Sequence, residues 1–206
     1  MPSLLRCKCV LLGDAGVGKT AIVKSLIGHP HSFSSKYIMT PGVEIFVKSI
    51  RSSNIDSTLE FFIYDFSGKP FYSDLVRKLW SNNVSIVVGV FDVNREDSFY
   101  SLQTQMTELF KQFDHPEEVI GIILGNKTDL TGRRSVSVEE AHQLAKKYKM
   151  RYFDVSAKES RSQIEEAFLY LTNLWFETNK KHYSPRHSVT FKNDPASQVR
   201  QQEQAA

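Results

Sequence analysis

Eight residues near the N-terminus have the types and spacing of a phosphate-binding loop: Gly13, Asp14, Ala15, Gly16, Val17, Gly18, Lys19 and Thr20. They fit the pattern G-x-x-x-x-G-K-[ST], and they lie between a short apolar run and a helical stretch, as such a loop requires. The glycines let successive backbone N–H groups face a β-phosphate, and the helix N-terminus adds partial positive charge. We expect Lys19 to reach the β- and γ-phosphates and the Thr20 hydroxyl to bind Mg²⁺, with Ala21 beside them in the nucleotide-binding set.

A second polar motif, Asn126-Lys127-Thr128-Asp129, follows another apolar run. It therefore lies at the carboxyl end of a predicted strand, where α/β proteins bind their ligands. A carboxylate only accepts hydrogen bonds, so Asp129 can accept from both the N1–H and the exocyclic amine of guanine. Adenine offers no such pair of donors. The motif predicts GTP or GDP as the ligand, with Asn126 and Lys127 in the base site.

Shorter motifs extend the predicted site. Ser156-Ala157-Lys158 follows the last predicted strand, and its backbone N–H groups are candidates to contact the guanine carbonyl oxygen; alone, the triplet also fits a plain strand-to-helix turn. Asp65-Phe66-Ser67-Gly68 supplies a carboxylate for the Mg²⁺ shell and a glycine N–H for the γ-phosphate. Thr40 is a candidate second hydroxyl ligand. The predicted metal ligands are thus Thr20, Thr40 and Asp65.

Apolar runs alternate with helical patterns along the chain. The turn residues Ser52-Ser53-Asn54 separate two predicted strands and indicate that these two form an antiparallel pair. The alternation predicts one α/β domain over residues 1–180, with a mostly parallel six-stranded sheet, one antiparallel edge strand and helices on both faces. Residues 181–206 are polar and predicted to form a disordered tail. The predicted strands are 7–12, 43–50, 59–64, 85–91, 119–124 and 153–155, and the predicted helices are 19–27, 97–113, 138–149 and 163–180.

Composition narrows the class of protein. The chain has 206 residues, of which 41% are hydrophobic, and a net charge of +3 that does not indicate a nucleic-acid binder. Cys7 and Cys9 alternate on one predicted strand, which favours packing in the core over a metal site. No apolar run is long enough to cross a membrane. The last residues, Gln201 to Ala206, lack a prenylation cysteine, so we expect no direct lipid anchor.

These motifs occur in the order found in the Ras superfamily, and the chain resembles its Rab branch over roughly residues 6–180. The stretch from Phe91 to Phe99, Phe-Asp-Val-Asn-Arg-Glu-Asp-Ser-Phe, is also similar to Rab proteins. The resemblance implies a small GTP-binding protein. It further implies that Phe33 packs edge-on against the guanine and that Tyr37 lies over the phosphates in the GTP form, both placed by their distance from Thr40.

The chain also departs from the Rab pattern. The catalytic glutamine of the family should follow Gly68, and Lys69 stands there instead. Together with Lys78-Leu79-Trp80 and the segment 125–134, this position is most similar to the Rab-like GTPases of the intraflagellar transport B complex. That resemblance implies a stable heterodimer with a small β-sandwich partner, intraflagellar transport protein 25, association with complex B, and location in the cilium or flagellum and the cytoplasm.

Two other functions remain open at this point. One is an unprenylated Rab-like switch in vesicle or cargo traffic, for which an activating protein supplies catalytic groups in trans. The other is a phosphate-loop kinase, although the motif at residues 126–129 argues against it and no lid for an acceptor substrate is evident. Loss of bound GTP accelerated by a partner extract would favour the switch, whereas ATP competing equally with GTP would favour the kinase.

Lys69 and Gly68 are the candidate catalytic residues, and Lys69 predicts slow hydrolysis. A charged lysine has no acceptor, so it cannot take a proton or a hydrogen bond from the attacking water, although it can stabilise charge developing on the γ-phosphate. Because positioning of the water carries much of the catalysis, unaided turnover should be slow and Lys69→Gln should raise it. Single-turnover hydrolysis of pre-loaded GTP measures this, and unaided turnover at the rate of an ordinary Rab would overturn it.

Overall fold

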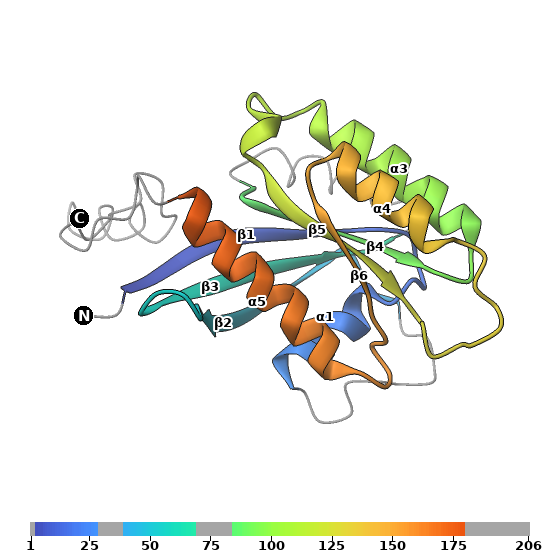
Figure 1. Cartoon of the computed structure of the whole chain (residues 1–206), viewed down its shortest axis with the longest axis horizontal. Coiled ribbons are helices and arrows are strands. Elements are labelled where there is room, and N and C mark those ends of the chain that lie inside the picture. Colours follow the sequence, from blue (N-terminus) through green and yellow to red (C-terminus); the bar gives the residue numbers. More distant parts are fainter. Residues whose placement is uncertain (1–2, 29–38, 69–83, 180–206) are drawn as a thin grey trace.

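The computed structural model describes residues 3–28, 39–68 and 84–179. Within these ranges six strands form one sheet in the order β2-β3-β1-β4-β5-β6 (Figure 1). The strands are β1 (Ser3–Leu12), β2 (Val43–Arg51), β3 (Ser57–Phe66), β4 (Ile86–Asp92), β5 (Ile120–Asn126) and β6 (Arg151–Asp154). The α-helices are α1 (Lys19–Ile27), α3 (Glu96–Phe110), α4 (Val138–Lys147) and α5 (Arg161–Thr178), and Pro116–Glu118 forms a short 3-10 helix.

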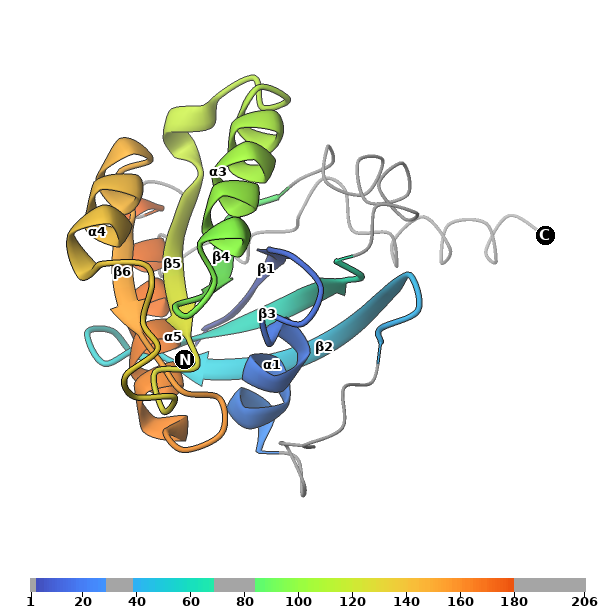
Figure 2. The ribbon, with the colours of Figure 1, turned by 90° about the vertical axis from the view of Figure 1, so that its right-hand side faces the viewer.

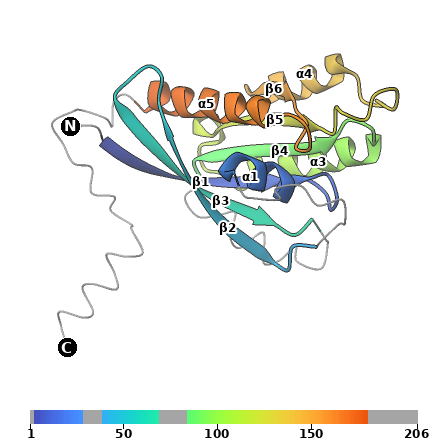
Figure 3. The same cartoon turned by 90° about the horizontal axis from the view of Figure 1, so that it is seen from below.

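The sheet has the predicted mixture of directions. Strands β2 and β3 pair antiparallel at one edge, and the remaining described pairs are parallel. The β2–β3 hairpin turn is tied to α5, because the Ser52 hydroxyl and the Ser53 N–H donate to Oδ1 of Asn173 over 2.8 and 3.2 Å. Figure 3 shows this hairpin end lying against α5. The prediction of a mostly parallel six-stranded sheet with one antiparallel edge strand is confirmed.

Helices cover both faces of the sheet, as predicted. Helices α1 and α5 pack on one face, and α3 and α4 pack on the other (Figure 2). Phe61 and Phe168 meet edge to face in the core between the sheet and helices α1 and α5, with ring centroids 5.6 Å apart. Cys7 and Cys9 are buried thiols in that same core, which confirms their packing role.

Some predicted boundaries are wrong by a few residues. Strand β1 begins at Ser3 rather than Cys7, because it pairs with β3 from Ser3 onward. The polar residues at its start hid this extension, and Arg6 forms a cross-strand ion pair with Glu60 at 2.9 Å. Helix α3 ends at Phe110 instead of Phe113. Strand β3 runs on through Phe66, so Asp65 lies within the strand.

The topology brings the polar motifs together at the carboxyl ends of the parallel strands. These strands are β1, β3, β4, β5 and β6, and the segments that follow them converge because the strands run in the same direction. None of the helices in the described ranges is long and apolar enough to cross a bilayer. The predicted tail, residues 181–206, lies outside the described residues.

Candidate functional site

The phosphate loop joins β1 to α1 and depends on a close approach at Gly18. Gly18 caps the N-terminus of α1 with a φ of 103°, a conformation that side-chain-bearing residues rarely adopt. A Cβ at this position would lie 2.2 Å from Nδ2 of Asn126. Glycine is therefore required both by the backbone conformation and by the second motif, which packs directly on the loop.

Lys19 lies buried inside the loop. Its Nζ donates to the carbonyl oxygens of Gly13 at 2.7 Å and Asp14 at 2.9 Å. Burial lowers the pKa of Lys19 to about 8, although the charges of Asp65 and Asp14 act to raise it. A desolvated ammonium held against a concave backbone is suited to pairing with an anion.

Thr20, Thr40 and Asp65 form one polar cluster, as the sequence predicted. The Thr20 hydroxyl donates to Oδ2 of Asp65 over 2.5 Å and lies 3.0 Å from the Thr40 hydroxyl, which itself lies 3.5 Å from the same carboxylate oxygen. Asp65 is fully buried, and its Oδ1 has no hydrogen-bond partner among the described residues. Burial raises the pKa of Asp65, and the Thr20 hydrogen bond and the Lys19 charge only partly offset this.

Gly68 lies against the phosphate loop, where a side chain would not fit. A Cβ at Gly68 would be 2.1 Å from the backbone nitrogen of Ala15 and 2.4 Å from the carbonyl carbon of Asp14. The segment after β3 thus reaches the part of the loop predicted to hold phosphates. Three other predicted site residues, Phe33, Tyr37 and Lys69, lie outside the described residues.

Asn126 links three separate motifs. Its Nδ2 donates to the carbonyl of Val17 over 2.8 Å, and its Oδ1 accepts from the Ala157 N–H over 3.0 Å. The side chain is almost fully buried, so both ends of its amide need these partners. Of the N–H groups predicted to face a guanine carbonyl oxygen, that of Ala157 is engaged with Asn126 in this structure.

Asp129 is oriented by the motif Ser156-Ala157-Lys158. Its Oδ1 accepts a hydrogen bond of 2.7 Å from the Ser156 hydroxyl, and its Oδ2 lies 4.0 Å from Nζ of Lys158. The Asp129 side chain is 7% exposed. The same Ser156 hydroxyl accepts from the backbone N–H of Glu159, which fixes the loop that carries it. The sequence predicted that these motifs belong to one site, and the structure brings them together.

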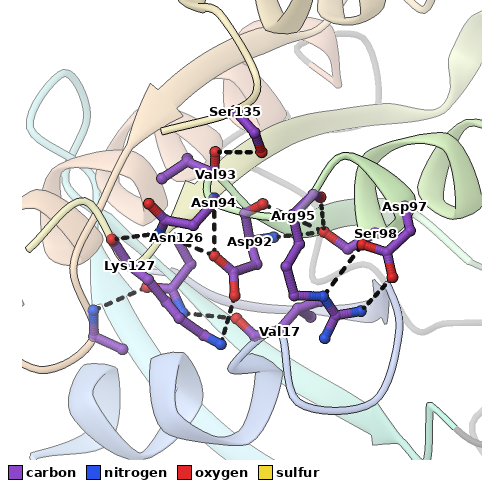
Figure 4. Close-up of polar contacts among 11 residues, drawn as sticks. Val17, Asp92, Val93, Asn94, Arg95, Asp97, Ser98, Asn126, Lys127 and Ser135 are labelled. Carbon is purple, nitrogen blue, oxygen red and sulfur yellow. Dashed lines mark hydrogen bonds and ion pairs between the residues drawn. The ribbon is translucent and has the colours of Figure 1, made fainter. Parts of the chain in front are cut away.

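Two further residues of this site, Asp92 and Asn94, were missed from the sequence. Oδ2 of Asp92 pairs with Nζ of Lys127 at 2.6 Å, while its Oδ1 accepts from both nitrogens of Asn94 (Figure 4). The Asn94 amide also donates to the Lys127 carbonyl over 3.1 Å, at a residue with a φ of 69°. No motif in the sequence indicates that these segments meet. The register of β4 and β5, which pairs Asp92 with Asn126, brings them together.

Comparison with known proteins assigns the chain to a family. A model of the Ras family matches residues 8–176. The chain belongs to the Ras family. A Ras-family domain implies binding of a guanine nucleotide, in agreement with the phosphate loop and the Asp129 motif.

Several relatives resemble the Ras-family chain over most of its length. It is 35% identical over 185 residues to the intraflagellar transport protein 27 homolog of Mus musculus, covering 90% of this chain and 98% of the relative. It is 30% identical over 175 residues to intraflagellar transport protein 27 of Chlamydomonas reinhardtii, covering 84% and 85%. It is also 30% identical over 174 residues to the Ras-related protein Rab-15 of Homo sapiens, covering 84% and 78%.

The buried Asp92 should stabilise the base side of the site. Replacing Asp92 with Ala removes the partner of Lys127 and the acceptor for two Asn94 donors, so the free energy of unfolding should fall by about 1–3 kcal/mol. Urea unfolding at saturating GDP measures this. Asp97→Ala is the control, because this exposed acid forms a surface ion pair with Arg95, whose loss should leave the midpoint near wild type. An unchanged midpoint for Asp92→Ala would contradict the assignment.

Proposed function

We propose that this Ras-family protein is a GTP- and GDP-binding subunit of the intraflagellar transport B complex and acts in cilia or flagella. Its similarity to intraflagellar transport protein 27 over nearly the full length of the mouse relative supports the transport role. The oriented carboxylate of Asp129, held by a hydrogen bond from Ser156, supports guanine as the base and is the observation that carries the nucleotide assignment.

Each motif has a separate task in this proposal. Asp129 accepts from the guanine N1–H and exocyclic amine, while the loop N–H groups and Lys19 bind the phosphates. Asn126 holds the base loop on the phosphate loop, and Lys127 ties the base loop to Asp92 at the end of β4. The proposed nucleotide-binding residues are Asp14, Ala15, Gly16, Val17, Gly18, Lys19, Thr20, Ala21, Thr40, Gly68, Asn126, Lys127, Asp129, Ser156, Ala157 and Lys158, with Phe33 and Tyr37 added by resemblance.

The polar cluster fits Mg²⁺. Mg²⁺ takes oxygen ligands and is usually held by one or two carboxylates together with substrate phosphates and waters. Asp65 offers an unpartnered buried oxygen, and the Thr20 and Thr40 hydroxyls lie beside it. Across the described residues no cluster of three or more His, Cys, Asp or Glu side chains is found, which suits an ion whose shell the nucleotide completes. When bound, the ion would neutralise phosphate charge next to the Asp65 carboxylate.

Base recognition by Asp129 can be tested by changing its hydrogen-bonding character. Asp129→Asn puts an amide donor where the guanine amine donates, so GDP binding should weaken by at least about 100-fold. Xanthosine diphosphate, which carries an oxygen in place of that amine, should bind the variant better than GDP does. Displacement of a fluorescent nucleotide measures both affinities.

Asp114→Asn is the matched control for this substitution, because Asp114 is an exposed acid in the segment between α3 and β5. It should bind GDP as the wild type does. GDP binding that survives Asp129→Asn undiminished would refute guanine recognition by this carboxylate, and equal competition by ATP would favour a kinase.

The proposed metal site is tested with the same fluorescent nucleotide. Chelation of Mg²⁺ should speed release of GDP from the wild type, and an unchanged rate would count against Thr20, Thr40 and Asp65 as metal ligands.

The partner proposal rests on the same relatives. We expect a stable heterodimer with intraflagellar transport protein 25, a small β-sandwich protein, and association through it with complex B. Capture of the tagged full-length chain from ciliated cells, followed by mass spectrometry, should recover that partner and transport subunits. Recovery of Rab effectors or escort proteins in their place would favour the alternative, an unprenylated Rab-like switch in vesicle or cargo traffic.

A further inference from the structure

Two side chains of α3 form hydrogen bonds with the first turn of the phosphate loop. Oε1 of Gln105 accepts from the Gly13 N–H over 2.9 Å, and Nε2 of Gln105 donates to Oδ1 of Asp14 over 2.9 Å. Ser101, one helical turn earlier, donates to the same Asp14 oxygen over 2.6 Å. We call Gly13, Asp14, Ser101 and Gln105 the α3 clasp. Figure 2 shows α3 beside the loop that leaves β1.

Both ends of the Gln105 side-chain amide form hydrogen bonds in the α3 clasp. The Gln105 amide has an acceptor and donors, and each engages a different residue of the loop, more than 90 positions away in the chain. Gln105 also donates to the Ser101 hydroxyl over 3.2 Å, which aligns the two α3 side chains. The Asp14 carboxylate consequently points toward α3.

The same two loop residues hold Lys19. The carbonyls of Gly13 and Asp14 accept from its Nζ, so their backbone is tied to α3 on one side and to the buried ammonium on the other. The backbone after Asp14 also packs closely on Gly68. A movement of this turn would therefore displace Lys19 and the contact with Gly68 together.

We propose that Gln105, aided by Ser101, is a positioning residue that slows nucleotide release by holding this turn in its binding conformation. The inference rests on the proposed binding of guanine nucleotide at the loop. A loop fixed in advance loses little freedom when a ligand binds, whereas a loosened loop must be ordered each time. Differences in affinity among variants of one site lie mostly in the dissociation rate, so release is the step that should change.

A charge change and its compensation test the clasp. Gln105→Glu keeps an acceptor for the Gly13 N–H but sets a carboxylate against Asp14, where the amide had donated. GDP should dissociate from this variant at least about tenfold faster than from the wild type. Adding Asp14→Asn changes only the side chain and restores a donor opposite the new carboxylate, so the double variant should release GDP more slowly than Gln105→Glu alone. Release of a fluorescent GDP is followed in the presence of excess unlabelled GDP.

Matched controls separate positioning from general loss of stability. Gln112→Glu makes the same chemical change at an exposed residue of the same region, whose side-chain amide donates to the Glu108 carbonyl, and it should leave release unchanged. Leu109→Ala opens a cavity under α3 and should lower the unfolding temperature while keeping release within about threefold of wild type. The ³¹P resonance of the β-phosphate of bound GDP should shift in Gln105→Glu and return in the double variant.

The outcomes divide clearly. Faster release in Gln105→Glu, restored by Asp14→Asn and absent from both controls, supports the clasp. A wild-type rate in Gln105→Glu, no restoration in the double variant, or equal acceleration by Leu109→Ala would each overturn it. Failure of the wild-type protein to retain GDP at all would instead refute the proposed nucleotide binding.

Discussion

The buried amide of Asn126 is the contact on which the arrangement of the site depends. A buried amide is costly unless its donor and acceptor are both satisfied, and these are satisfied by Val17 in the phosphate loop and Ala157 after β6. One side chain therefore fixes the distance between the end that suits phosphates and the end that suits a base. The absence of a Cβ at Gly18 is the steric condition for this contact.

The charges of the site are arranged for a ligand that carries both signs. Burial lowers the pKa of Lys19 and raises that of Asp65, so each group is held where its charged form is disfavoured by the protein alone. An anion beside Lys19 and a cation beside Asp65 would relieve both effects. A nucleotide phosphate together with a divalent metal ion has this pattern of charge, and the two hydroxyls beside Asp65 match the oxygen ligands such an ion prefers.

The helices on one face of the sheet contribute differently to the site. Helix α4 buries Ala141, Leu144 and Ala145 in the core, and its N-terminus is closed by a capping box between Ser137 and Glu140. Helix α3 also supplies core residues, but it turns Ser101 and Gln105 toward the phosphate loop. A helix that is otherwise part of the scaffold is thereby connected to the segment that holds the ammonium of Lys19.

The sequence by itself determined the motifs, their order and the class of fold. A phosphate loop must follow a strand and open a helix, and the alternation of apolar runs with helical patterns is a local property of the chain, so both were visible without coordinates. The cluster of Thr20, Thr40 and Asp65 was also predicted, because its chemistry follows from the residue types and from the order of the motifs along the chain. The exact ends of strands and helices were less certain, since polar residues such as Arg6 can occupy a strand when a partner strand supplies Glu60.

Only the tertiary structure decided which residues support these motifs. Asp92 lies 35 residues before Lys127 and Gln105 lies 91 residues after Asp14, and no periodicity connects either pair. Their contacts arise from the register of β4 against β5 and from the packing of α3 on the sheet. Hydrogen bonds and ion pairs between distant segments depend on distances of about 3 Å, and such distances are set by how whole elements pack rather than by local sequence.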